Sequence, residues 1–132
     1  MAYNTMDNAN LDLAVTRQES ATLTLGAGQF YIIADSGLND VALTLPRGVN
    51  GADGTASVGK IYVISCMSNS GNNVTLSHHA NDRLRKAPGA RPSDHSGSPL
   101  TLDNGKTMWL IYTGVFGGNG EWHVIAEFDG GI

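Results

Sequence analysis

Residues 106–128 read Lys-Thr-Met-Trp-Leu-Ile-Tyr-Thr-Gly-Val-Phe-Gly-Gly-Asn-Gly-Glu-Trp-His-Val-Ile-Ala-Glu-Phe, and this stretch decides the fold. Two runs rich in β-branched and aromatic residues flank a glycine-rich turn at 114–120, which predicts a β-hairpin. Successive side chains of a strand point to opposite faces. The first run is apolar on both faces and is expected to be a buried central strand, whereas the second is expected to be half exposed. The apolar face of the second run carries Trp122, Val124, Ala126 and Phe128.

Similar runs recur along the chain between turns rich in Gly, Asn and Asp. Runs at 29–34 and 60–66 are apolar on both faces, and shorter runs with a Thr-Leu theme lie at 21–25, 41–45, 74–76 and 100–102. The unequal spacing of the theme does not fit a solenoid with a fixed repeat, and no window shows a helical period. Short half-buried strands alternating with longer two-sided ones predict an all-β fold of two packed antiparallel sheets, a β-sandwich or jelly-roll-like barrel.

The length of 132 residues fits one domain. We expect a loose N-terminal arm at 1–19 and a single β-domain at 20–132, interrupted by an irregular basic loop at 78–98. The arm contains apolar residues that could order against a partner. The basic loop is either a solvated surface loop or a docking surface for an acidic protein or a subunit. The candidate contact residues in these two segments are Met6, Leu11, Leu13, Val15, Arg83, Arg85, Lys86 and Arg91.

Composition and charge argue against several classes of protein. A net charge of −4 argues against nucleic-acid binding. No apolar run approaches the roughly 20 residues that span a membrane, and the N-terminus lacks the pattern of a signal peptide. We therefore expect no membrane partner and synthesis in the cytoplasm of the cell that makes the chain. The single cysteine, Cys66, ends an apolar run and is expected to be a buried, unreactive thiol.

Patterns that would indicate catalysis or metal binding are weak. Residues 93–95 read Ser-Asp-His, but adjacency in sequence does not create a catalytic triad. His78 and His79 are neighbours in an extended segment and point to opposite sides, which disfavours a shared metal. Glu121 and Glu127 share one strand face and are expected to be solvated. The sequence therefore predicts no enzyme activity, no metal and no cofactor.

Several segments together carry a resemblance to a known group of proteins. They read Phe-Tyr-Ile-Ile-Ala-Asp at 30–35, Val-Ala-Leu-Thr-Leu-Pro at 41–46, Gly-Lys-Ile-Tyr-Val-Ile at 59–64, Asn-Val-Thr-Leu at 73–76, Trp-Leu-Ile-Tyr at 109–112 and Glu-Trp-His-Val-Ile at 121–125. In this order, over residues 20–128, they resemble a β-domain common in the structural proteins of tailed bacteriophages. Such domains occur in capsid decoration (cement) proteins, head fibres and tail appendages, commonly as homotrimers. The resemblance implies no catalytic residues.

The resemblance implies a non-enzymatic virion protein. The expected role is a capsid decoration protein that binds the major capsid protein on the outer capsid surface, stabilises the shell and forms a homotrimer. A short chain starting at Met1, without a fibre shaft, favours this role. Subunit contacts are expected from Trp122, Val124 and Phe128, provided that the sheet leaves this face uncovered. One alternative is a tail-fibre or baseplate module that recognises a host-surface glycan, and another is an enzyme that degrades surface polysaccharide.

Overall fold

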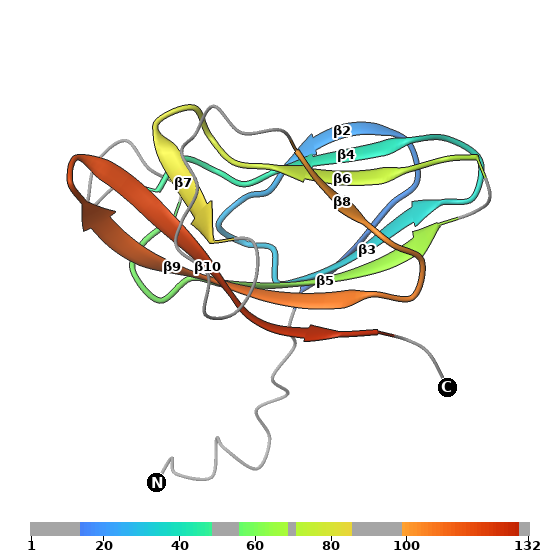
Figure 1. The fold of residues 1–132 in the computed structure, drawn as a ribbon. Coiled ribbons are helices and arrows are strands. Elements are labelled where there is room, and N and C mark those ends of the chain that lie inside the picture. Colours follow the sequence, from blue (N-terminus) through green and yellow to red (C-terminus); the bar gives the residue numbers. More distant parts are fainter. Residues whose placement is uncertain (1–13, 49–55, 69–70, 86–98, 130–132) are drawn as a thin grey trace, which may run out of the picture.

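The computed structural model describes residues 14–48, 56–68, 71–85 and 99–129. These residues form ten β-strands and no helix, and the strands lie in two facing sheets (Figure 1). The all-β, sandwich-like fold is therefore confirmed. The strands are β1 (Val15–Gln18), β2 (Ala21–Thr24), β3 (Tyr31–Ser36), β4 (Val41–Thr44), β5 (Ile61–Ser68), β6 (Val74–Ser77), β7 (Asp82–Arg85), β8 (Leu100–Leu102), β9 (Thr107–Phe116) and β10 (Asn119–Phe128).

The large sheet has six strands in the order β1-β3-β5-β9-β10-β7, and the small sheet has four in the order β2-β4-β6-β8. Both sheets are mixed. The pairs β1–β3, β3–β5, β7–β10, β2–β4 and β4–β6 are parallel, and the remaining pairs are antiparallel. The prediction of antiparallel sheets is therefore wrong. From β1 to β6, successive strands belong to alternate sheets. The chain therefore enters each sheet in the same direction every time, which makes neighbouring strands of this part parallel.

The recurrent Thr-Leu theme marks the small sheet. The segments 21–25, 41–45, 74–76 and 100–102 supply β2, β4, β6 and β8, which lie side by side. Leu23, Leu43 and Leu76 are in register across the first three of these strands. Equal register with unequal sequence spacing is possible because the connections between strands differ in length. In the first six strands, each pair of one large-sheet and one small-sheet strand stacks on the next pair. The pairs lack the fixed repeat length that a regular solenoid would need.

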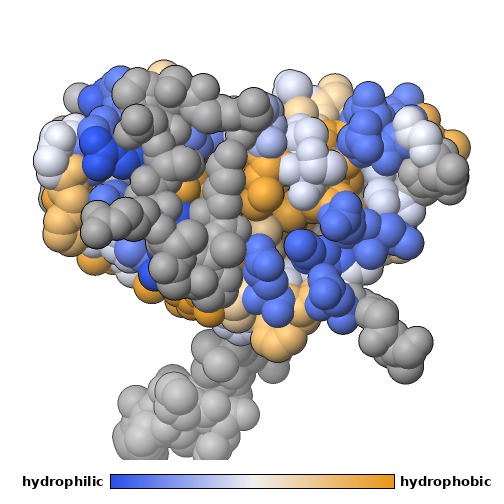
Figure 2. Space-filling view, viewed as in Figure 1, coloured by the Kyte–Doolittle hydropathy of each residue, from blue (hydrophilic) through white to orange (hydrophobic). Residues whose placement is uncertain are grey.

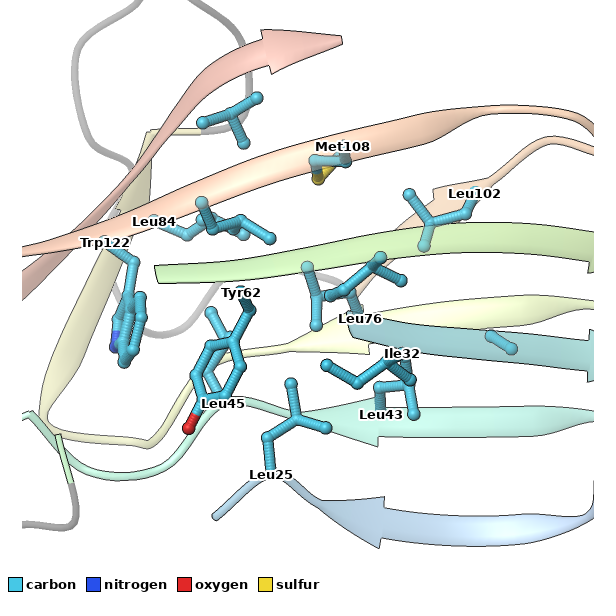
Figure 3. Packing of buried hydrophobic residues seen from close by; sticks show 14 of the residues in the cluster. Leu25, Ile32, Leu43, Leu45, Tyr62, Leu76, Leu84, Leu102, Met108 and Trp122 are labelled. Atoms are coloured by element: carbon cyan, nitrogen blue, oxygen red, sulfur yellow. The ribbon is translucent and has the colours of Figure 1, made fainter. Parts of the chain in front are cut away.

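The hydrophobic core lies between the two sheets (Figure 3). Its largest members are Trp122, Tyr62 and Tyr112, which have no exposed surface. The Trp122 ring lies 5.6 Å from the Tyr62 ring and 5.3 Å from the Tyr112 ring between centroids, within the range of favourable aromatic pairs. Leucines from the small sheet, including Leu43 and Leu76, complete the packing. The core therefore joins both sheets of one domain.

The predicted hairpin at 106–128 is confirmed as β9 and β10, but its side chains are distributed differently from the prediction. A register shift between Val124 and Ala126 marks a β-bulge in β10. Because strand side chains alternate, one extra residue moves the rest of the strand to the opposite face. Trp122 and Val124 consequently point into the core and are 0% exposed, whereas Phe128 lies beyond the bulge and is 57% exposed.

Two predicted segment boundaries change. Residues 15–18, assigned to a loose arm, form β1 at the edge of the large sheet. Residues 82–85, assigned to an irregular loop, form β7, which pairs with β10. In β7, Asp82 and Leu84 are buried and alternate with half-buried Arg83 and Arg85. Arg83 and Arg85 are therefore strand residues, because a partner strand distant in sequence completes their pairing.

A buried carboxylate links β7 to the segment that follows β4. Asp82 is 1% exposed, and its Oδ2 accepts the Gly48 N–H at 2.8 Å. Gly48 in turn lies directly against the ring of Tyr112, so closely that a Cβ at residue 48 would be 2.1 Å from a ring carbon. A glycine is therefore required where this chain segment crosses the aromatic core.

Candidate interaction surface

The face of the large sheet that points away from the core carries several exposed large hydrophobic residues. We call it the outer face. Its residues alternate along each strand with the buried residues of the core. Its apolar members are Val15 on β1, Tyr31 and Ile33 on β3, Ile61, Val63 and Met67 on β5, Trp109 and Ile111 on β9, and Ile125 and Phe128 on β10.

One row of the outer face is apolar across five adjacent strands. Paired residues place Val15 beside Tyr31, Tyr31 beside Val63, Val63 beside Trp109 and Trp109 beside Ala126. Directly opposed side chains on one face of a sheet contact each other. Val63, between two aromatic neighbours, is accordingly only 6% exposed. The row is a continuous apolar strip, unlike the scattered single hydrophobic residues common on protein surfaces.

Hydrogen bonds fix the side chains beside this strip. The Tyr31 hydroxyl donates to Ser65 Oγ at 2.9 Å, and Ser65 Oγ lies 2.9 Å from Thr107 Oγ1. These three residues come from three adjacent strands. The chain of hydroxyl groups orients the Tyr31 ring within the sheet face. The surface is therefore pre-organised, and little side-chain freedom remains to be lost when it is covered.

The described residues leave much of the outer face open to solvent. Phe128 is 57% exposed, Met67 46%, Ile125 43% and Trp109 37%. Figure 2 shows hydrophobic residues along the lower edge of the molecule, where the large sheet lies, and hydrophilic residues over much of the right-hand part. Contiguous exposed apolar patches on soluble domains mark interaction sites. The expectation that β9 is buried on both sides is wrong, because the described residues cover only its inner side.

Charged side chains lie at both ends of the outer face, and each end contains both signs, with carboxylates more numerous at one end and arginines at the other. At the acidic end, Arg17 pairs with Glu19 at 2.9 Å and also with Asp35. The Gly37 N–H donates to Asp35 Oδ1, and this bond together with Arg17 lowers the pKa of the Asp35 carboxyl from its usual value. Asp129, after the end of β10, is exposed at this same end of the sheet.

The basic end lies where β7 pairs with the first half of β10. Arg83 and Arg85 are opposite Glu121 and His123 in the parallel pair. His123 Nε2 lies 3.0 Å from Glu121 Oε1, and the Arg85 guanidinium donates to the Val124 carbonyl at 3.2 Å. Register runs from Arg85 through His123 to the start of β5. Glu19 and Asp35 lie near the other strand ends, on the β1 and β3 side of the sheet, so they and the two arginines of β7 occupy diagonally opposite corners of the outer face.

Some of the predicted contact residues lie on this face and others do not. Val15 is on β1 and is 62% exposed, and Arg83 and Arg85 form the basic end. Trp122 and Val124 are corrected: both are fully buried in the core of their own chain, so neither can contact another subunit. The prediction for Phe128 stays open, since this side chain is exposed. Met6, Leu11, Leu13, Lys86 and Arg91 lie outside the described residues.

Sequence reasoning missed the central residues of the outer face, Val63, Trp109 and Ile111. The signal was present, because their strands are apolar on both sides. That pattern is typical of a strand buried on both faces, and it was interpreted as burial within the chain. A strand with one face in the core and the other in contact with a separate partner is also apolar on both sides.

The cysteine and the histidine pair singled out in the sequence make ordinary hydrogen bonds. Cys66 is 2% exposed, its thiol donates to the Leu102 carbonyl at 3.3 Å, and burial raises its pKa. This confirms the predicted burial of Cys66. His78 Nδ1 contacts the His79 carbonyl, and no group of three metal-ligating side chains lies together in the described ranges. No described helix is long and apolar enough to cross a membrane.

Two open depressions lie among the described residues, near the starts and turns of the strands. One, of about 340 Å³, is lined by both apolar and polar residues, namely Ala21, Thr22, Asp40, Val41, Ala42, Asn73 and Thr75. The other, of about 200 Å³, is lined by Glu19, Asp35, Gly37 and Leu38. The first depression lies over strands of the small sheet, whereas the second borders the acidic end of the outer face.

Comparisons of the chain with protein-family models, with curated proteins and with solved structures give no match. The functional assignment therefore rests on the sequence and on the geometry of the outer face.

Proposed function

We propose that this chain is a non-enzymatic structural protein of a phage virion, and specifically a capsid decoration protein on the outer capsid surface. The observation that supports the proposal is the outer face, an exposed apolar strip on the rigid large sheet. A protein that acts by adhesion needs a pre-organised contact surface of this kind. Small-molecule chemistry instead uses a concave pocket with convergent polar groups.

The proposed mechanism is mechanical. The partner is the major capsid protein, and binding occurs to the assembled shell in preference to the free subunits. A ligand that binds one state only stabilises that state by mass action, by about 2.7 kcal/mol at a hundredfold excess over Kd. Bridging of neighbouring capsid subunits would thus resist shell opening. The chain would be made in the host cytoplasm and reside on the virion.

A second candidate is a tail-fibre or baseplate module that binds a host-surface glycan. The larger depression favours it, because Thr22, Asp40, Asn73 and Thr75 present hydroxyl, carboxylate and amide groups that can hydrogen-bond sugar hydroxyls. The Asp40 carboxylate is partly occupied, since its Oδ1 accepts the Asn73 N–H at 2.7 Å. A glycan array without a hit would count against this candidate.

Immunogold electron microscopy of intact particles from the source of this protein tests the proposal. Gold distributed over the head is the expected result. Gold confined to the tail tip would replace the decoration role with the receptor-binding one. Absence of gold from every particle would refute any virion role. The homotrimer implied by the resemblance is a separate expectation, which a mass measurement in solution addresses.

A further inference from the structure

The face of the small sheet that points away from the core consists almost entirely of hydroxyl side chains. Leu43 and Leu76 pack in the core, so the residues beside them on their strands point outward. The outward residues that lie in register are Thr22, Ala42, Thr75 and Thr101 in one row, and Thr24, Thr44 and Ser77 in the next. Ala42 is the one member of these two rows without a hydroxyl group, and it leaves a gap between Thr22 and Thr75.

The larger of the two depressions includes this gap. It has a volume of about 340 Å³, and its lining includes Thr22, Ala42 and Thr75, with Asp40 and Asn73 at the end where β4 and β6 begin. This volume is at the small end of the range of small-molecule pockets, about 300–1,000 Å³. We propose that the depression binds one ring of an uncharged sugar, seated on Ala42 between the two threonines.

This inference rests on the second candidate function, glycan binding, and deepens it by naming the site and the class of sugar. It also goes beyond the decoration role. The depression lies on the small sheet and the outer face belongs to the large sheet, on the opposite side of the sandwich (Figure 1). A chain attached through the outer face would therefore keep the depression open to a ligand.

The polar groups of the depression are available to a ligand. Within the described residues, the hydroxyl groups of Thr22 and Thr75 and the side-chain amide of Asn73 form no hydrogen bond. Asp40 Oδ1 accepts the Asn73 N–H at 2.7 Å, which fixes the carboxylate and leaves its second oxygen without a partner in the described ranges. Hydroxyl and amide groups both donate and accept, whereas a carboxylate only accepts. The hydroxyl groups of a sugar, which do both, match this set.

The backbone and side chains of the site are pre-organised. Threonine is branched at Cβ and stiff about χ1, which fixes the hydroxyl groups on both sides of Ala42. Ala21 lines the same depression and has a left-handed φ of 58°. Residues other than glycine adopt this conformation at an energetic cost, and such residues cluster at functional sites. Little conformational freedom therefore remains to be lost when a ligand binds.

The lining disfavours other classes of small ligand. The described residues that line the depression include no lysine, arginine or histidine, so an anion would meet only the Asp40 carboxylate and be repelled. They also include no aromatic side chain that could stack on a planar ring. One exposed carboxylate contributes little affinity for a cation. An uncharged aliphatic ring with several hydroxyl groups fits, because the methyl groups of Ala42 and the threonines can contact its C–H groups.

Heteronuclear NMR of the isotope-labelled full chain tests the inference. The probes are the methyl glycosides of glucose, galactose, mannose and N-acetylglucosamine, with methyl glucuronide as the acidic probe. At least one neutral glycoside should shift the amide signals of Thr22, Ala42 and Thr75, with a Kd of about 1–10 mM for so few contacts. Methyl glucuronide should bind at least about fivefold more weakly than that glycoside, because the Asp40 carboxylate repels it.

Three variants separate the parts of the site. Ala42→Thr fills the gap and should weaken binding at least about tenfold, and it should fold normally because threonine is favoured in strands. Thr75→Val keeps the shape but removes a hydroxyl group, and should weaken binding about three- to tenfold. Ser77→Thr is the matched control, since it adds a methyl group in the next row, outside the lining; its Kd should stay within about twofold.

Asp40→Asn tests the preference for uncharged sugars. The new side chain can still accept the Asn73 N–H through its amide oxygen, but the negative charge is gone. The ratio of the Kd for methyl glucuronide to the Kd for the neutral glycoside should fall to within about twofold of one. An unchanged ratio would overturn the role assigned to Asp40.

The other outcomes decide between the inference and the functions above. Absence of shifts with all four neutral glycosides, or full binding by Ala42→Thr, overturns the inference. A glycan-array hit that leaves the signals of Thr22, Ala42 and Thr75 unmoved also overturns it, but keeps the glycan-binding candidate on another surface. The immunogold result locates the chain on the particle and leaves the sugar site unaffected.

Discussion

Replacement of Gly48 by alanine is expected to strain the core at one identifiable contact. The added Cβ would lie 2.1, 2.5 and 2.6 Å from three carbons of the Tyr112 ring. Ordinary contact begins at 3.4 Å, so the ring and residue 48 must separate by about 1.3 Å. The ring is fully buried and packs on Trp122, and residue 48 is tied to Asp82 by its N–H. Neither side can move without breaking another contact.

The magnitude follows from measured costs of overpacking. Extra carbons in a well-packed core cost about 1–3 kcal/mol and occasionally more, and the depth of this overlap favours about 3 kcal/mol. For a chain of this length the melting temperature should fall by roughly 10–15 °C. Folded domains have about 5–15 kcal/mol of stability, so Gly48→Ala should remain folded and measurable. Urea denaturation and a thermal melt, both followed by circular dichroism, give the two quantities.

A control variant and a double variant test the cause of this destabilisation. Gly28→Ala adds the same methyl group where no atom lies within 4 Å, and it should change the free energy of unfolding by less than about 0.5 kcal/mol. Neither glycine has a left-handed φ, so backbone strain does not contribute to the difference. Tyr112→Leu in the Gly48→Ala background should recover about 1–2 kcal/mol relative to additivity. Equal stability of Gly48→Ala and Gly28→Ala, or strict additivity in the double variant, would refute the reasoning.

Three further predictions concern the core. Gly120→Ala should destabilise the domain by about 2 kcal/mol, because its Cβ would be 2.5 Å from Asp82 Oδ1 and 2.7 Å from a backbone oxygen; an unchanged urea midpoint would contradict it. Cys66 should react with a thiol reagent only as the chain unfolds, since the thiol is buried and its pKa is raised; complete reaction in native buffer would show that the thiol is accessible. Burial also raises the pKa of Tyr62 and of Tyr112, with the Asp82 charge a second cause at Tyr112. The folded state therefore keeps its stability below the unfolded pKa of 10.0 and loses it as the pH rises above that value. Tyr112→Phe should shift alkaline unfolding to higher pH, and an unshifted midpoint would exclude Tyr112 as a cause.

The Tyr112→Phe variant has a second expected property. The Tyr112 hydroxyl is buried without a hydrogen-bond partner among the described residues, so its removal should cost little at neutral pH. The Tyr62 hydroxyl is different, because it donates to the Gly26 carbonyl at 2.8 Å. Tyr62→Phe should therefore cost about 0.5–1.5 kcal/mol, and the two phenylalanine variants control for each other.

The sequence by itself determined the all-β class, the hairpin at 106–128, the Thr-Leu segments as a distinct set of strands and the burial of Cys66. These features depend on local side-chain alternation and on turn residues, which a short window contains. The same reasoning placed Trp122 and Val124 on one face with Phe128. The bulge between Val124 and Ala126 reverses that relation for Phe128, and nothing in the local pattern distinguishes an extra residue from a regular strand.

The tertiary structure alone decided which strands pair and which faces are covered. Parallel pairing of β1, β3 and β5, and pairing of β7 with β10, join segments far apart in the chain. Their hydrogen bonds use backbone groups that every residue possesses, so the sequence carries little record of the partner. An apolar residue such as Trp109 is favoured against any apolar surface, whether in its own chain or in another. Only the positions of the two sheets show that the described residues of the chain leave the outer face uncovered.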